Sequence, residues 1–301
     1  MQSAIGNLQS AIGLFDSGVG GLSVAREIMR RLPGHPLIYL ADQAHAPYGQ
    51  RPLAEIRALS AGITRFLLDQ GSRVIVIACN TASAAALRSL RAEFPAVSFV
   101  GMEPAVKPAA ERSRSGHVGV IATSATFQGE LFASLLDRFA GSVTVHTQVC
   151  PELAPLVEAG ELASERTRQA LTGYLAPLLA ADIDELVLGC THYPFLRTLI
   201  EEIAGPGVEV IDPAPAVARQ TGRVLGLNGE SGVEPGPGVV LLPPSAHRFC
   251  TTGDPARFQA ALLDLLGIES EVSGAAWDRD GRLFQVISQM DLGYNLGYRS
   301  Q

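Results

Sequence analysis

Short runs of apolar residues alternate along the chain with longer amphipathic stretches. The apolar runs have the length of buried strands and cover residues 11–15, 37–41, 73–78, 97–100, 117–122, 142–145, 185–189 and 208–211. Between them, stretches such as residues 53–70 and 128–139 place apolar side chains three and four positions apart, which is the period of a helix that covers a sheet. The repeated strand and helix units predict an α/β fold with mostly parallel strands flanked by helices.

The two halves of the chain carry similar segments. VIVIACNTASA at residues 74–84 resembles ELVLGCTHYPF at residues 185–195, because each is an apolar strand that ends in a cysteine followed by polar residues. GLFDSGVGG at residues 13–21 and GVIATSATFQG at residues 119–129 likewise repeat a strand, a polar turn and a helix. We therefore expect two similar domains, with the active site in the cleft between them.

The order of these units predicts the domain boundaries. We expect residues 12–103 to form the body of the first domain and residues 104–212 to form the second. A late strand and helix return to the first domain in this interpretation, so that it also contains residues 213–267 and is discontinuous. The Gly- and Pro-rich residues 226–244 are typical of a surface connection, and the pattern assigns no role to the C-terminal tail, residues 268–301.

Composition narrows the class of protein. Apolar residues make up 47% and charged residues 18%, which is typical of a globular chain, and the net charge of -7 with no run of Lys or Arg argues against direct nucleic-acid binding. No apolar stretch reaches the roughly 18 to 20 residues that span a bilayer, and the N-terminus lacks the features of a secretion signal. The four cysteines lie far apart, as expected for reduced thiols, so we expect a cytoplasmic protein without a membrane partner.

Ligands of an open α/β sheet bind beyond the carboxyl ends of the strands, which selects the polar residues that matter. The residues that closely follow predicted strands are Asp16, Ser17, Asp42, Pro47, Tyr48, Gly49, Cys79, Asn80, Thr81, Thr123, Thr126, Cys190, Thr191 and His192. We expect them to converge from the two halves. The hydroxyl and amide groups among them supply hydrogen-bond donors for a small zwitterion.

Cys79 and Cys190 each follow a strand and precede a helix, where amide dipoles favour the thiolate. A substrate between two such thiols loses its α-proton to one thiolate and regains a proton from the other thiol on the opposite face. This inverts the carbon and predicts two-base racemisation. The alternative for any single cysteine is a small buried hydrophobe, and we assign that role to Cys150 and Cys250, which lack the matched placement.

Two further residues are candidates to assist the thiols. His192 lies two positions after Cys190, where its imidazole is placed to tune the thiol or shuttle its proton, and Asp16 is the equivalent candidate for Cys79. The alternatives are a helix N-cap for Asp16 and a satisfied turn residue for His192. The Gly-rich segment at residues 16–23 opens a helix and is a candidate to bind an α-carboxylate through its amides, or else a tight turn.

Two other chemistries compete with thiol catalysis. Cys79, Cys190 and His192 are also a candidate zinc site, but the close ligand spacing of typical zinc sites is missing, and we predict no metal. A pyridoxal-phosphate racemase needs a lysine for its Schiff base. Lys107 is the only lysine of the chain and lies far from every candidate motif, so we expect no cofactor.

At these residues the chain resembles the glutamate racemases, which are cofactor-independent members of the aspartate/glutamate racemase superfamily. The resemblance covers about residues 12–266 and excludes the N-terminal ten residues and the tail beyond Gly267. The motifs that carry it, in chain order, are GLFDSGVGG, ADQAHAPYGQR, IACNTASA, CPELAPLVE, LGCTHYPFL and FCTTGD.

The resemblance implies roles for individual residues. Cys190 is expected to deprotonate L-glutamate and Cys79 to deprotonate D-glutamate, assisted by Asp16, His192 and Glu158. From the sequence alone Glu158 is an exposed helical acid. The positions that match substrate-contacting residues of the family are Asp16, Ser17, Tyr48, Gly49, Asn80, Thr81, Thr126, Thr191 and His192.

The resemblance also implies a substrate and a pathway. Related aspartate racemases carry Glu where this chain has His192, so glutamate is the expected substrate, and D-glutamate is a precursor of peptidoglycan. Family analogy adds a homodimer and an interaction with DNA gyrase to the expected partners. Two alternative functions stay open at this point: a racemase of aspartate or another small acidic amino acid, and a non-enzymatic regulator that binds gyrase.

Overall fold

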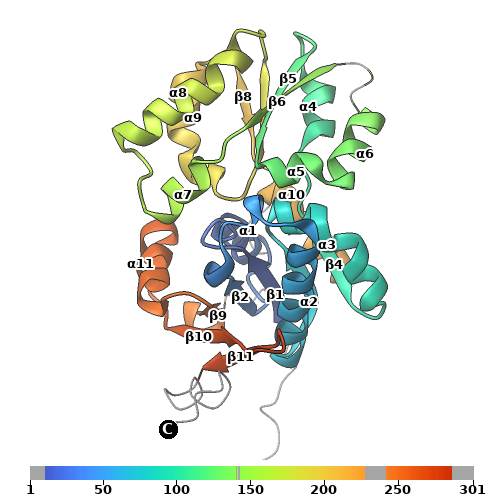
Figure 1. Ribbon diagram of the computed structural model, residues 1–301, viewed down its shortest axis with the longest axis vertical. Coiled ribbons are helices and arrows are strands. Elements are labelled where there is room, and N and C mark those ends of the chain that lie inside the picture. Colours follow the sequence, from blue (N-terminus) through green and yellow to red (C-terminus); the bar gives the residue numbers. More distant parts are fainter. Residues whose placement is uncertain (1–10, 140, 142, 228–241, 287–301) are drawn as a thin grey trace, which may run out of the picture.

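Two β-sheets, each covered by helices on both faces, form the computed structural model, which describes residues 11–139, 141, 143–227 and 242–286 (Figure 1). The larger sheet occupies the lower part of Figure 1 and the smaller sheet the upper part. The strand order is β11-β10-β9-β2-β1-β3-β4 in the first sheet and β6-β5-β7-β8 in the second. Apart from the antiparallel pair β10–β11, all strand pairs are parallel, which confirms the predicted fold class.

Alternating side chains assign the two faces of the first sheet to different helices. Its strands are β1 (Ala11–Asp16), β2 (Leu37–Ala41), β3 (Ser72–Ile77), β4 (Ser98–Gly101), β9 (Arg248–Thr251), β10 (Val272–Trp277) and β11 (Leu283–Val286). Val74 and Val76 pack with α1 (Leu22–Arg31), α10 (Ala214–Val224) and α11 (Pro255–Leu266). Ile75 and Ile77 face α2 (Leu53–Asp69) and α3 (Asn80–Glu93). Because both faces are buried, the strands are apolar runs rather than alternating ones.

The second sheet is built in the same way. Its strands are β5 (His117–Ala122), β6 (Thr144–Val149), β7 (Glu185–Gly189) and β8 (Glu209–Ile211). One face packs on α4 (Val106–Arg112), α5 (Ser124–Gln128) and α6 (Glu130–Phe139), and the other on α7 (Leu153–Glu158), α8 (Glu165–Leu179) and α9 (Arg197–Ala204). One apolar cluster contains both Leu14 of the first sheet and Leu188 of the second, so the two units share a continuous core.

Most predicted strands lie within one or two residues of the observed ones, but β6 begins two residues later than predicted and extends to Val149. It is an edge strand whose residues are half-buried or exposed, so no apolar run marks its extent. The tail without an assigned role contributes β10 and β11 to the first sheet. Residues 228–241 of the expected surface connection lie outside the described part.

The sheets hold the strands that the predicted domain boundaries require. Strands β1 to β4 and β9 belong to one sheet and β5 to β8 to the other, while the boundaries themselves stay a prediction. Within the described ranges, every helix is too short or too polar to cross a membrane.

Candidate active site

The carboxyl ends of strands from both sheets line one cavity of about 450 Å³. Ten of the catalytic and substrate-contacting residues that the resemblance implies lie in its wall: Ser17, Tyr48, Gly49, Cys79, Asn80, Thr81, Glu158, Cys190, Thr191 and His192. The six from Ser17 to Thr81 come from loops and a helix start beside the first sheet. The four from Glu158 to His192 come from elements beside the second sheet. The parallel topology therefore brings residues from the two similar halves of the sequence to one cavity.

Cys79 caps the N-terminus of α3. Its Sγ accepts a hydrogen bond from the backbone N–H of Ala82 at 3.4 Å and lies 4.0 Å from Ser17 Oγ. Burial raises the pKa of the Cys79 thiol far above its usual range, the negative charge of Asp16 raises it further, and the Ala82 amide only partly offsets them. The helix start predicted for Cys79 is confirmed, but its effect on the thiolate is outweighed, and Cys79 is a neutral thiol at neutral pH.

Cys190 has a different environment. A 3-10 turn, η4 (Tyr193–Leu196), follows it, and α9 begins only at Arg197, so the prediction of an α-helix directly after Cys190 was wrong. The partner of its thiol is instead His192, whose Nδ1 lies 3.6 Å from Cys190 Sγ. A cation at this distance stabilises a thiolate, so the second thiol depends on an imidazole rather than on helix amides.

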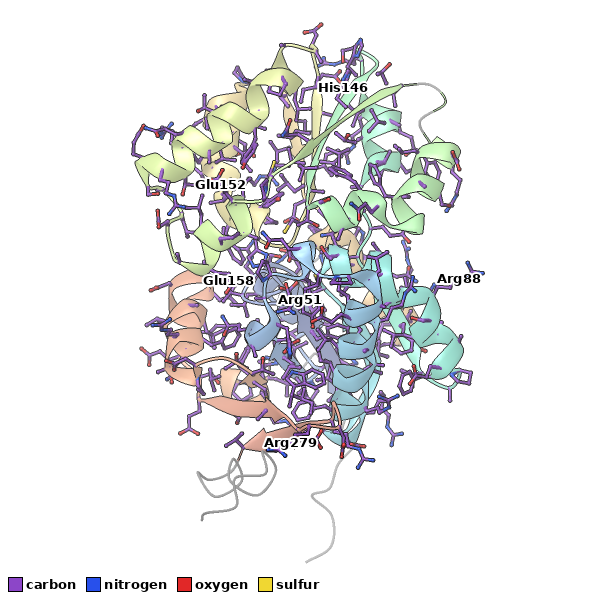
Figure 2. All side chains as sticks on the ribbon, in the orientation of Figure 1. Arg51, Arg88, His146, Glu152, Glu158 and Arg279 are labelled. Atoms are coloured by element: carbon purple, nitrogen blue, oxygen red, sulfur yellow. The ribbon has the colours of Figure 1, made fainter. Side chains whose placement is uncertain are left out.

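Glu158 links this imidazole to Val19 and Gln43 of the first unit. Figure 2 shows Glu158 where the two units meet. Its Oε1 lies 2.7 Å from His192 Nε2 and accepts the backbone N–H of Val19 at 2.7 Å, while Oε2 accepts Gln43 Nε2 at 3.0 Å. Burial by itself raises the pKa of Glu158, but the hydrogen bond and positive charge of His192 outweigh it and lower that pKa below its usual value. Glu158 is therefore an ionised cavity residue and not the exposed acid that helical spacing suggested.

His192 has a correspondingly perturbed pKa. Burial lowers it, but hydrogen bonds to Cys190 and Glu158 more than compensate and place the pKa well above its usual value. The imidazole is therefore a cation at neutral pH, held between a carboxylate and a thiol. It is not the satisfied turn residue that was the alternative.

The Gly-rich loop passes close to this group. A Cβ at Gly18 would lie 1.8 Å from Glu158 Oε1, and one at Gly20 would lie 2.4 Å from His192 Nδ1, so both positions require glycine. The predicted role of the loop in binding an anion needs correction at two amides: Gly18 N–H donates to Asp16 Oδ1 and Val19 N–H to Glu158. The loop holds catalytic candidates of this chain rather than offering those amides to a ligand.

Asp16 is fully buried behind the cavity wall rather than in it. Its Oδ2 accepts the hydroxyl of Thr191 at 2.9 Å, and α1 is capped by Gly21, so Asp16 is not its N-cap. Burial raises its pKa, opposed mainly by the positive charge of His192. The structure shows no hydrogen bond between Asp16 and Cys79 in the described part of the chain, and its position supports an indirect effect on that thiol.

The remaining polar residues of the wall differ in whether they have hydrogen-bond partners within the protein. Both polar atoms of the Asn80 amide are buried without a hydrogen-bond partner among the described residues, although Asn80 lines the cavity. Thr81 Oγ1 instead bonds to Thr123 Oγ1 at 2.9 Å and to Thr126 Oγ1 at 3.3 Å. Thr123 lies in the wall and Thr126 behind it, so the substrate contact that the resemblance implies for Thr126 stays a prediction. A buried amide without partners is an incomplete site that a polar ligand completes.

The sequence did not single out two polar residues of the wall, Gln43 and Arg257. Gln43 lies within the ADQAHAPYGQR motif and bonds to Glu158 and, through its Oε1, to the Thr251 hydroxyl at 2.8 Å. Arg257 lies in the first turn of α11 and lines the cavity, and nothing in its sequence context marks it.

The two competing chemistries find no support in this geometry. Among the described residues, no group of three or more His, Cys, Asp and Glu side chains is close enough to hold a metal ion. Lys107 lies on α4 with its side chain 56% exposed, 3.8 Å from Glu111, and not in the cavity wall.

Comparisons with known proteins point to one family. The family model described as Asp/Glu/Hydantoin racemase matches residues 19–221. A protein of Ectopseudomonas mendocina named glutamate racemase is 49% identical over 88% of this chain and 97% of its own length. Two solved glutamate racemases are similar in structure. The Francisella tularensis enzyme, in complex with D-glutamate, has a TM-score of 0.74 at 29% identity over 88% of this chain and 97% of its own. The Escherichia coli enzyme, in complex with L-glutamate and an activator, has a TM-score of 0.75 at 31% identity, with coverage of 89% and 99%.

Proposed function

The chain belongs to the Asp/Glu/hydantoin racemase family, within its glutamate racemases, and from this premise we propose that it interconverts L- and D-glutamate with Cys79 and Cys190 as the two bases. The observation that carries the proposal is the different surroundings of the two thiols in one cavity: Cys79 is a buried neutral thiol, and Cys190 contacts a cationic imidazole. A two-base racemase needs one thiolate and one thiol at the same time.

In the direction from L-glutamate, Cys190 is the base. Its thiolate takes the α-proton, and the electron pair left on the α-carbon is delocalised into the α-carboxylate. Cys79 then donates its thiol proton to the opposite face, which gives D-glutamate and leaves Cys79 as the thiolate. The reverse reaction follows the same steps with the two thiols exchanged, so no atom or electron is required beyond substrate and enzyme.

The developing charge needs donors that are already in place. The Asn80 amide, which has no partner among the described residues, is the group we assign to the substrate α-carboxylate or ammonium, with Ser17, Thr81, Thr191 and the Tyr48–Gly49 segment around it. His192 contacts the Cys190 thiol, and Glu158 keeps His192 protonated and oriented. Asp16 orients Thr191, and Thr126 positions the hydroxyls of Thr81 and Thr123.

Glutamate is the proposed substrate because glutamate racemases of Ectopseudomonas mendocina and Herpetosiphon aurantiacus are about half identical to this chain over most of its length. Its product, D-glutamate, serves peptidoglycan synthesis and hence cell-wall biogenesis and cell shape. A cytoplasmic location, a homodimer and gyrase binding stay predictions from the family. A gyrase-binding regulator without enzymatic activity would inhibit gyrase equally well when both thiols are replaced.

The test is incubation with L-glutamate in deuterated water, using protein dialysed free of pyridoxal phosphate and aspartate as the comparison substrate. We expect optical activity to decay while deuterium enters the α-position, and aspartate to react far more slowly. Cys79→Ser should still exchange the α-proton of L-glutamate through Cys190 without forming D-glutamate, and Cys190→Ser should behave likewise with D-glutamate. Cys150→Ser is the matched control, because Cys150 is a buried thiol outside the cavity wall. Mild and equal losses in the two variants would exclude the two-base scheme.

A further inference from the structure

The C-terminal hairpin β10–β11 reaches the loop beside the active site through Trp277, the only tryptophan of the chain. Its Nε1–H donates to Asp42 Oδ1 at 2.9 Å, and its ring lies edge-on to the imidazole of His45 with 5.5 Å between ring centroids. The ring fits against Gly62 of α2, where a Cβ would lie 2.5 Å from it. A residue of the tail therefore bonds to the segment that directly follows β2.

Asp42 is the centre of this contact. The carboxylate is fully buried and accepts the Tyr48 hydroxyl at 2.6 Å on Oδ2 and the Thr252 hydroxyl at 2.8 Å on Oδ1, and His45 Nδ1 lies 3.1 Å away. Burial alone raises the pKa of Asp42, but hydrogen bonds from His45, Tyr48 and Trp277 outweigh it and lower that pKa below its usual value. Asp42 is thus an ionised, buried acceptor, and its charge is stabilised by the hydrogen bonds that it accepts.

The segment that Asp42 fixes is part of the cavity wall. Ala46, Pro47, Tyr48 and Gly49 all line the cavity, whereas neither Asp42 nor Trp277 does. The Tyr48 hydroxyl is bound to Asp42, so the position of Asp42 sets the position of Tyr48 and of the backbone around it. A shift of about 1 Å in a wall of this kind is enough to weaken substrate binding.

We propose that Trp277 is a positioning residue of the active site, which acts through Asp42 to hold the wall segment 46–49 in the geometry that binds substrate. This inference rests on the proposed function for its kinetic consequence and on the structure alone for the placement of the loop. It gives the hairpin, which lies beyond the family motifs, a role in substrate binding. The thiols and His192 lie on other elements, so the chemical step itself is left intact.

The variant that tests the proposal is Trp277→Phe, which keeps an aromatic ring against Gly62 and His45 but removes the donor to Asp42. We expect KM for both enantiomers of glutamate to rise roughly tenfold, equivalent to about 1.4 kcal/mol, with kcat changed less than about twofold. Phe284→Leu is the matched control, because Phe284 lies in β11 of the same hairpin, paired with Ala276, and makes no contact with Asp42 that the structure records. It should lower the melting temperature without changing KM.

A second variant disturbs the same contact by displacing the Trp277 ring. Gly62→Ala places a methyl group where the Trp277 ring lies and favours the helical conformation of α2, so it displaces the ring without weakening the helix. It should raise KM in the same way as Trp277→Phe. Tyr48→Phe removes the hydrogen bond between Tyr48 and Asp42. Adding Trp277→Phe to this variant should raise KM little further, because both residues act through Asp42.

Amide hydrogen exchange of the protein without substrate separates this inference from the proposed function. Trp277→Phe should speed exchange in residues 42–50, and Phe284→Leu should not. Unchanged exchange in that segment would refute the positioning role, and faster exchange with an unchanged KM would refute its relevance to substrate. Failure of the wild-type protein to racemise glutamate would overturn the proposed function, while the exchange experiment would still decide whether Trp277 holds the loop.

Discussion

Replacing Glu158 by Gln removes one negative charge next to His192 and leaves the shape of the side chain almost unchanged. In the wild-type protein Glu158 Oε1 lies 2.7 Å from His192 Nε2, and the pKa of His192 is well above its usual value of 6.5. The glutamine oxygen is still able to accept the Val19 amide. The substitution therefore tests whether the carboxylate keeps the imidazole protonated, rather than whether the loop needs a partner.

The expected size of the effect follows from the hydrogen bond that is lost. A hydrogen bond to a charged group contributes about 1.5 to 3 kcal/mol, and losing this stabilisation of the imidazolium lowers the pKa of His192. The side chain of Glu158 is 21% exposed, so solvent screening favours the lower half of this range. Because the imidazole then loses its proton at a lower pH, the alkaline limb of the kcat/KM profile should move to lower pH.

The assay is the initial rate of racemisation between pH 6 and 10, followed by polarimetry from each enantiomer. Glu152→Gln is the control, because Glu152 lies just before α7 (Figure 2), its carboxylate accepts the Tyr174 hydroxyl at 2.8 Å, and it is not part of the cavity wall. Its pH profile should match that of the wild-type protein. A Glu158→Gln profile with lower rates but an unmoved alkaline limb would refute the assigned effect on His192 and leave Glu158 as a packing residue.

Three further outcomes are expected. Asn80→Ala should lower kcat by about 10²-fold while it raises the free energy of unfolding by about 1 kcal/mol, measured by urea denaturation, because it removes a substrate donor that is buried without a partner. Gly18→Ala should reproduce the kinetic loss of Glu158→Gln by pushing that carboxylate away, whereas Gly173→Ala, whose Cβ meets nothing within 4 Å, should keep full activity and stabilise α8 by about 0.5 to 1 kcal/mol. Because the pKa of Glu158 is lowered, its ionisation stabilises the fold at pH values above 4.5, and this stabilisation is lost as the pH falls through the lowered pKa. Because the pKa of His192 is raised, its protonation stabilises the fold at pH values below 6.5, and this stabilisation is lost as the pH rises through the raised pKa. The melting-temperature difference between wild type and Glu158→Gln should therefore be greatest between these two pH values.

The strands and the fold class were predictable because each central strand is buried on both faces and therefore has a run of apolar residues in the sequence. This holds for β1, β2, β3, β5 and β7. The edge strand β6 was placed too early, and β10 and β11 were not predicted, since most of their residues are only half-buried. Strands of this kind are specified by the neighbour they pair with, and that neighbour is distant in the sequence.

The candidate site was predictable where a residue follows a central strand, and less so where the opposite half of the molecule supplies it. Cys79 and Cys190 are of the first kind. Glu158 is of the second, because helical spacing describes its own helix and not the loop at Gly18 that approaches it; only the resemblance to glutamate racemases indicated it. Thr123 and Thr126 are three positions apart on one turn, and the sequence pattern does not determine which hydroxyl faces the cavity.

The internal repeat predicts two equivalent thiols, and the structure makes them unequal by what surrounds them. Where Cys190 has His192 two residues later, Cys79 has Thr81, and the charge that most affects the Cys79 thiol is the carboxylate of Asp16. Cys79 is therefore held as the neutral thiol, the form that donates a proton when L-glutamate is the substrate. L- and D-glutamate have equal free energies in water, so kcat/KM must nevertheless be the same in both directions at every pH. The inequality of the thiols must then appear as matched differences in kcat and KM, and any substitution at Glu158 or His192 must change kcat/KM for the two enantiomers by the same factor.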